Sequence, residues 1–101
     1  MDQFFRIDTK DDFLILSSKE PHLKVTAITG YTEDITTLVG TIHREFRFSR
    51  DEDNYSQWTE LTTENLQLIK FGAEERFWIE YRYTLVTDGE LQLNSVSLNV
   101  T

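Results

Sequence analysis

The sequence predicts an all-β protein, an antiparallel β-sandwich of seven or eight short strands. Three observations lead to this fold class. Residues 77–86 alternate in side-chain type, turn signals recur about every 8–12 residues, and no helical pattern is long enough for a strand–helix–strand unit. Short strands separated by regular turns are typical of sandwiches and barrels, so we expect two packed sheets.

The strongest strand signal is residues 77–86, which we place at the centre of a sheet. A period of two separates its side chains into two faces, and aromatic and β-branched residues suit a half-buried pleated surface. One face is expected to point into the core, and it carries Phe77, Ile79, Tyr81, Tyr83 and Leu85. The other is expected to point outward, and it carries Trp78, Glu80, Arg82, Thr84 and Val86.

Further strands are expected at residues 13–16, 22–29, 42–49, 55–61 and 91–100, with a short apolar edge strand near Phe4. Residues 31–40 are expected to form a surface loop, and Thr62 or Thr63 to cap a single helical turn or start a loop. The expected core set is Phe13, Ile15, Leu23, Val25, Phe46, Phe48, Trp58, Leu66, Phe77, Ile79, Tyr81, Tyr83 and Leu98.

Two local signals concern the last strand. Asp88-Gly89 between apolar runs favours a two-residue hairpin, which would make residues 77–86 and 91–100 antiparallel neighbours. The apolar positions of the last strand change parity after Leu93, from odd to even. One extra residue restores the inward face, so we place a β-bulge at Asn94-Ser95.

Length and composition indicate a single domain over residues 1–101. The chain has no cysteine and a formal net charge of -8, so its surface repels nucleic-acid phosphates and anionic lipids. No apolar run reaches the roughly 20 residues that span a bilayer. We therefore expect neither nucleic acid nor a membrane as a partner.

No set of residues predicts an enzyme, a cofactor or a metal site. The acidic turn at residues 51–54 begins like a calcium loop, but Tyr55 stands where an oxygen ligand is needed and the turn glycine is missing. His22 and His43 lack a metal-ligand spacing, and no G-x-S-x-G elbow is present. A solvated turn and incidental histidines are the favoured interpretation.

One stretch resembles a known family. Phe46-Arg47-Phe48-Ser49 leads through a polar turn to Tyr55-Ser56 and Trp58, followed by Leu61, Asn65-Leu66 and Tyr81-Arg82-Tyr83. This pattern is similar to the fibronectin-like β-sandwich modules of baseplate and tail proteins in contractile-tailed bacteriophages, although their turn often reads Asp-Gly where this chain has 51–54. The resemblance covers residues 14–100 and implies a fibronectin- or jelly-roll-like fold.

The resemblance implies a structural virion module of a baseplate or tail, located in the virion after assembly in the host cytoplasm. Its partners would be other virion subunits or further copies of itself, and the chain would be a small protein or one segment of a larger one. The candidate interface is Trp78 with Arg82 and Arg47, because Trp and Arg are enriched at interface hot spots. An alternative is that residues 31–40 cover Trp78. A second functional class, a carbohydrate-binding module using Trp58 and Trp78, also stays open.

Overall fold

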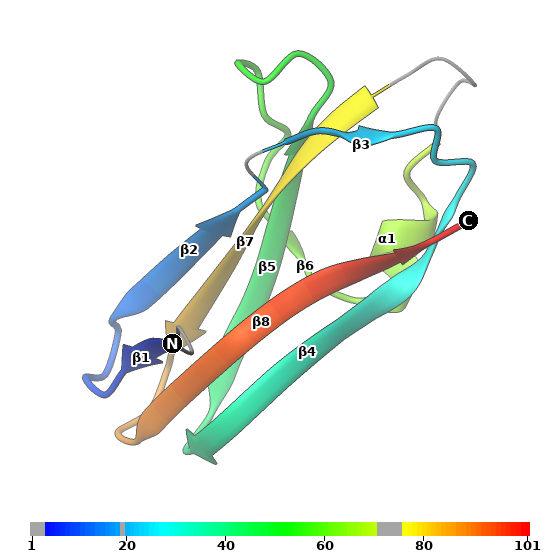
Figure 1. Cartoon of the computed structure of the whole chain (residues 1–101). Helices are drawn as coiled ribbons and strands as arrows, with labels where there is room; N and C mark the ends of the chain where they lie inside the picture. The colour runs from blue at the N-terminus through cyan, green and yellow to red at the C-terminus, as the bar shows by residue number, and fades with distance from the viewer. Residues whose placement is uncertain (1–3, 19, 71–75) are drawn as a thin grey trace.

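The computed structural model describes residues 4–18, 20–70 and 76–101, and it forms a sandwich of two antiparallel β-sheets (Figure 1). The elements are β1 (Phe5–Ile7), β2 (Phe13–Ser17), β3 (His22–Leu23), β4 (Ile28–Val39), β5 (Ile42–Ser49), β6 (Thr59–Glu60), α1 (Thr63–Gln67), β7 (Arg76–Leu85) and β8 (Glu90–Val100). The all-β fold class expected from the sequence is therefore confirmed.

The two sheets are built from strands far apart in the sequence. The smaller sheet has the order β1-β8-β4, and the larger has the order β2-β7-β5-β6, with β3 also paired to β7. The strand expected at the centre, β7, does lie inside its sheet between β2 and β5. However, β7 and β8 lie in different sheets, so the hairpin expected at Asp88-Gly89 is wrong: this connection crosses the sandwich.

The crossing at Asp88-Gly89 packs against another connection between the sheets, the one that joins β4 to β5. The Thr41 N–H donates to Thr87 Oγ1 over 2.8 Å, and the Val86 N–H donates to the Thr41 carbonyl over 2.9 Å. A Cβ on Gly89 would lie 1.9 Å from the carbonyl oxygen of Val39. The glycine that suggested a hairpin is therefore needed for close approach between two backbones.

The β-bulge expected at Asn94-Ser95 is confirmed. Along the β4–β8 ladder, Asp34 lies opposite Ser95 and Ile35 lies opposite Leu93, so Asn94 is the extra residue. Leu91 and Leu93 are fully buried before the bulge, and the inward side chains after it have even numbers. The bulge thus keeps one face of β8 toward the core although its apolar pattern changes parity.

The core lies between the sheets and contains most of the residues expected there. The buried cluster is Ile7, Val25, Ile28, Phe46, Leu61, Leu66, Ile69, Phe77, Ile79, Tyr81, Tyr83, Leu85, Leu91 and Leu93, with Phe48 and Leu98 packed against it. Leu23, however, is 62% exposed. The adjacent Lys24 has a φ of 55°, so β3 ends there, after only two residues.

Strand β2 corrects the expectation for the apolar run at residues 13–16. Leu14 and Leu16 pack against the core, whereas Phe13 and Ile15 are 53% and 42% exposed. This strand pairs with β7 on one side only, which makes it a sheet edge. Its alternate side chains therefore point outward, where nothing in the described chain buries them.

The segment expected to be a surface loop, residues 31–40, is instead most of the 12-residue strand β4. Thr32, Asp34 and Thr36 are exposed on its outer side, whereas Tyr31, Glu33 and Ile35 alternate with them and are half-buried. Of the alternatives left open at Thr62 and Thr63, the structure has the helical turn: α1 begins after Thr62, whose side-chain oxygen accepts from the Asn65 N–H over 3.0 Å. Leu66 and Ile69 pack inward, but Leu68 is 74% exposed.

One polar cluster joins the two sheets. Glu33 of β4 accepts hydrogen bonds from Arg44 of β5, with an Nη2–Oε1 distance of 2.6 Å, and from the Tyr83 hydroxyl of β7 over 2.5 Å. Burial alone would raise the pKa of Glu33, but the hydrogen bonds from Arg44 and Tyr83 lower it on balance. The Glu33 carboxylate therefore stays charged and ties both layers together.

Candidate functional site

The outer face of the larger sheet brings together two of the three residues expected at an interface, Arg47 and Arg82. Its three main strands are in register, so that Glu80 of β7 lies between Ser17 of β2 and Arg47 of β5. Two residues further along β7 on the same face, Arg82 lies opposite Glu45 of β5. The sequence placed Arg47, Glu45, Glu80 and Arg82 on outward faces, and the structure confirms that these faces are adjacent.

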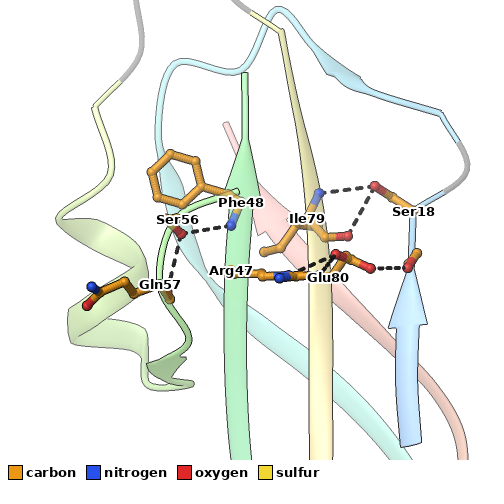
Figure 2. A network of polar contacts seen from close by, with 8 residues as sticks. Ser18, Arg47, Phe48, Ser56, Gln57, Ile79 and Glu80 are labelled. Carbon is orange, nitrogen blue, oxygen red and sulfur yellow. Dashed lines mark hydrogen bonds and ion pairs between the residues drawn. The ribbon is translucent and has the colours of Figure 1, made fainter. Parts of the chain in front are cut away.

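Two ion pairs join β5 and β7 on this face, one with its arginine on β5 and the other with its arginine on β7. Arg47 donates to Glu80 from Nε over 2.9 Å and Nη2 over 2.8 Å, and Glu80 also accepts from the Ser17 hydroxyl over 2.7 Å. Figure 2 shows the Arg47–Glu80 pair bridging β5 and β7. Arg82 makes the matching contacts to Glu45, with Nε and Nη2 at 2.9 and 2.8 Å from Oε1.

Trp58 lies over both arginines. The guanidinium carbon is 4.6 Å from the ring centroid for Arg47 and 4.4 Å for Arg82. The Tyr55 ring adds a second contact to Arg47 at 4.8 Å. We call Trp58, Arg47 and Arg82 the tryptophan–arginine stack. Each cation–π contact stabilises by roughly 0.5–1 kcal/mol at an exposed site, so the stack holds these side chains in place without dominating the fold.

The local chain explains how Trp58 reaches this position. Residues 55–61 were expected to form one strand with Trp58 in the core, but only a bridge from Tyr55 to Ser49 and the two-residue strand β6 form there. The Ser56 hydroxyl accepts from the Phe48 N–H over 3.1 Å, which holds this segment beside β5 (Figure 2). The irregular segment lets Trp58 lie over the outer face, half-buried.

Trp78 differs from the other two residues of the expected interface. It lies on the outward parity of β7, opposite Ser49, yet only 5% of it is exposed. The Arg76 guanidinium lies 5.2 Å from its ring centroid. The alternative that residues 31–40 cover Trp78 is wrong, because they belong to β4 in the other sheet. Arg47 and Arg82 are thus brought together under Trp58 rather than beside an exposed Trp78.

An apolar margin borders the tryptophan–arginine stack. Phe13 lies opposite Thr84, and Ile15 lies opposite Arg82, on the edge strand β2. Both apolar side chains are exposed on the same outward face as Arg82 and Glu45. The face therefore combines aromatic, arginine and aliphatic groups in one surface, which is the composition of interface centres.

The other sites considered from the sequence have structural partners. In the acidic turn, Asp51 accepts from the Asn54 and Asp53 N–H groups over 2.7 and 3.0 Å, and from the Ser49 hydroxyl over 2.8 Å. Hydrogen bonds from the Asn54 backbone and side chain, then Ser49 and Asp53, hold the pKa of Asp51 far below its ordinary value. Asp51 therefore acts as the capping residue of its own turn.

The two histidines lie in different surroundings. His22 stacks on Phe77 with ring centroids 4.9 Å apart, and burial lowers its pKa. His43 is about half exposed, 3.8 Å from Glu45. Within residues 4–18, 20–70 and 76–101, no three His, Cys, Asp or Glu side chains are grouped as metal ligands.

Sequence reasoning missed how Trp58 and Tyr55 take part in this face. The alternation rule places residues of a regular strand, and it fails where residues 55–58 leave the ladder after one bridge. The paired charges of Glu45 with Arg82, and Arg47 with Glu80, gave a usable signal, because opposite charges on neighbouring strands favour pairing.

Comparison with known proteins gives no matching family model, no matching curated protein and no matching solved structure. In the described ranges, no helix has the length and apolar character needed to cross a membrane.

Proposed function

We propose that this chain is a non-enzymatic binding module that holds another protein subunit against the outer face of its larger sheet. The observation that carries the proposal is the tryptophan–arginine stack beside the exposed apolar margin of Phe13 and Ile15. A few residues, most often Trp, Tyr and Arg, supply most of the binding free energy at protein interfaces, and nearly neutral contacts around them exclude water.

The geometry also supports tight docking because the face is ordered before any partner arrives. Ion pairs to Glu80 and Glu45 fix the two arginines, and Trp58 packs over both. Association loses roughly 0.5–1.5 kcal/mol for each flexible side chain that must be immobilised. Residues already held in one arrangement avoid that loss, so the stack is suited to recognition more than to folding stability.

For the biological setting, we propose a structural role in a bacteriophage baseplate or tail, with other virion subunits as partners. Its support is the sequence resemblance over residues 14–100, together with the β-sandwich that the resemblance implies. The alternative, a carbohydrate-binding module, has weaker support, because Trp78 is 5% exposed and so offers no ring face to a sugar.

The test is incorporation into particles. Tagged chain would be produced in cells that assemble tails from the genome encoding it, and the tails would be separated by sedimentation and blotted. We expect the unchanged chain to co-sediment, and Trp58→Ala and Ile15→Lys to reduce its amount at least about tenfold, an affinity change of about 1.4 kcal/mol or more.

The matched control is Leu38→Lys, which adds the same charge at a residue 43% exposed in β4, against 42% for Ile15. Its incorporation should equal that of the unchanged chain. Absence of the unchanged chain from tails would overturn the virion setting. Equal incorporation of Ile15→Lys and Leu38→Lys would overturn the docking face. Glycan-array binding that Trp58→Ala abolishes would favour the carbohydrate alternative instead.

A further inference from the structure

Glu80 lies in the middle of the outer face of the larger sheet. Strand β7 runs between β2 and β5, so Glu80 has Ser17 opposite it on one side and Arg47 on the other. One oxygen of its carboxylate, Oε1, accepts from Arg47 Nε and Nη2 over 2.9 and 2.8 Å. The second oxygen, Oε2, accepts from the Ser17 hydroxyl over 2.7 Å. A single carboxylate therefore joins three strands across the face.

The two parts of the docking face lie at opposite edges of this sheet. The apolar margin, Phe13 and Ile15, is on β2, and Trp58 comes directly before β6, in the sheet order β2-β7-β5-β6. Among the described residues, Glu80 is the one whose side chain hydrogen-bonds on this face to both β2 and β5. The other ion pair of the face joins only β7 and β5. A link between the two parts through side-chain hydrogen bonds therefore passes through Glu80.

The Ser17 hydroxyl fixes the orientation of the Glu80 carboxylate. The terminal torsion of a glutamate side chain has broad minima, so the carboxylate is free to turn unless a partner holds it. A hydroxyl makes a short, strong hydrogen bond to a carboxylate oxygen, and here it holds Oε2 toward β2 and leaves Oε1 facing Arg47. The rings of Tyr55 and Trp58 lie 4.8 and 4.6 Å from the guanidinium carbon of Arg47. The place of Arg47 beside these rings therefore depends on a hydroxyl of β2.

We propose that Ser17 and Glu80 are positioning residues, which make the order of the tryptophan–arginine stack depend on β2, the strand that carries the apolar margin. Contacts made by a partner to the margin and to the stack are then energetically coupled, because both depend on the same hydrogen-bonded carboxylate. This inference rests on the docking face proposed above. It adds the reason why the two parts of that face act as one surface.

NMR of the free chain tests the coupling without any partner. Ser17→Ala removes the hydroxyl that binds the carboxylate. Ser18→Ala is the matched control, because its hydroxyl donates to the Ile79 carbonyl over 3.3 Å and accepts from the Ile79 N–H over 3.2 Å (Figure 2). We expect Ser17→Ala to shift the signals of the Arg47 Nε–H and the Trp58 indole N–H, and Ser18→Ala to leave both unchanged. Equal shifts in the two variants would mean a general loosening of β2 and would overturn the proposal, as would unshifted signals in Ser17→Ala.

A second background tests whether the coupling passes through Glu80. Glu80→Met keeps a side chain of similar length but accepts no hydrogen bond from Ser17 or Arg47. In this background, adding Ser17→Ala should shift the Arg47 and Trp58 signals no further. A further shift as large as the one seen with Glu80 present would show that the effect bypasses the carboxylate, and it would overturn the role given to Glu80.

A double-mutant cycle on stability gives a result that does not need Glu80→Met to fold. Residues that share a network have non-additive effects, whereas unconnected residues have nearly additive ones. The effects of Ser17→Ala and Trp58→Ala on the unfolding equilibrium constant should therefore differ from additivity by at least about threefold. Those of Ser18→Ala and Trp58→Ala should add within about twofold. Urea unfolding measures both cycles, and equal additivity in the two would contradict the coupling.

Incorporation into tails then gives the functional result. Ser17→Ala should reduce incorporation at least about threefold, although Trp58 and Ile15 are both still present. Ser18→Ala should leave it unchanged, and Ser17→Thr, which keeps the hydroxyl, should restore both incorporation and the NMR signals. Full incorporation of Ser17→Ala, alongside the loss expected for Trp58→Ala and Ile15→Lys, would overturn the positioning role and leave the docking face standing. Coupled signals in the free chain, together with absence of the unchanged chain from tails, would support the positioning role and overturn only the virion setting.

Discussion

Among single residues, Glu33 shows most clearly how the fold changes a side chain's role. From the sequence it is one acid in a polar stretch, and it was expected on a surface loop. In the structure it faces inward from β4 and accepts hydrogen bonds from Arg44 and Tyr83. Removing the Glu33 carboxylate from this part-buried cluster would leave Arg44 and Tyr83 without these hydrogen bonds, so the three side chains act as one unit.

Glu33 should make folding stability sensitive to acid. Its pKa is lower in the folded chain than its ordinary value of 4.5, so the unfolded chain binds more protons as the pH falls. The stabilisation is present above pH 4.5 and is lost as the pH falls through the lower, folded value. In Glu33→Gln we expect about 1.5–3 kcal/mol less stability at pH 7 and a weaker loss on acidification, measured by urea unfolding at several pH values.

The matched control is Asp34→Asn, at an exposed neighbour on the same strand. It removes the same charge without touching the inter-sheet cluster, so its stability and acid dependence should match those of the unchanged chain. The Asp51 turn also responds to acid, but it is present in every variant and cancels in the comparison. Equal pH dependence in Glu33→Gln and the unchanged chain would contradict the role given to Glu33.

At the scale of elements, two of the connections between the sheets, β4 to β5 and β7 to β8, pack closely against each other. A Cβ on Gly89 would lie 1.9 Å from the Val39 carbonyl oxygen. Gly40 has a φ of 91°, a backbone conformation that residues with a side chain rarely adopt. By contrast, a Cβ on Gly30 would meet its nearest atom, in the Thr63 side chain, at 3.4 Å.

Gly89→Ala should therefore destabilise the chain by about 3 kcal/mol or more, at the upper end of what overpacking costs. Gly30→Ala, the matched control, should change stability by less than about 1 kcal/mol. Chemical denaturation followed by tryptophan fluorescence measures both. If the two variants unfolded at the same denaturant concentration, the packing of the two crossings against each other would be refuted.

For the molecule as a whole, the division between core and surface predicts which apolar residues hold the fold. Phe46 and Ile79 are 3% and 0% exposed in the cluster between the sheets, whereas Phe13 is 53% exposed on an edge strand. Phe46→Ala should cost about 3–5 kcal/mol and Ile79→Ala about 2–5 kcal/mol, out of a total of roughly 5–15. Phe13→Ala should cost about 0.5 kcal/mol or less.

Thermal melting and urea unfolding of the three variants measure this ranking. Phe13→Ala is also the control for the loss of an aromatic side chain as such. A melting temperature of Phe13→Ala as low as that of Phe46→Ala would mean that β2 is covered on both faces, and the exposed margin of the proposed docking face would then not exist.

The sequence by itself determined the local features of this protein. Alternation over 77–86 and the parity change at Asn94 depend on residues close together in the chain, and both predictions are confirmed. At Thr62 or Thr63 the sequence left a capped helical turn and a loop open, and the structure has the turn capped by Thr62. The outward parity of Arg47 and Arg82 was also readable, because side-chain direction in a regular strand follows from residue number alone. That part of the candidate site was therefore predictable.

Only the tertiary structure decided which strands share a sheet. An Asp-Gly pair fits a hairpin and also a tight crossing between layers, and the choice depends on Val39, about 50 residues earlier in the chain. The apolar run at 13–16 fits either a buried strand or an edge strand. In the structure β2 is an edge strand that pairs only with β7, and Phe13 and Ile15 are exposed on it. Trp58 lies on the outer face, over two arginines from different strands, and no local pattern encodes that contact.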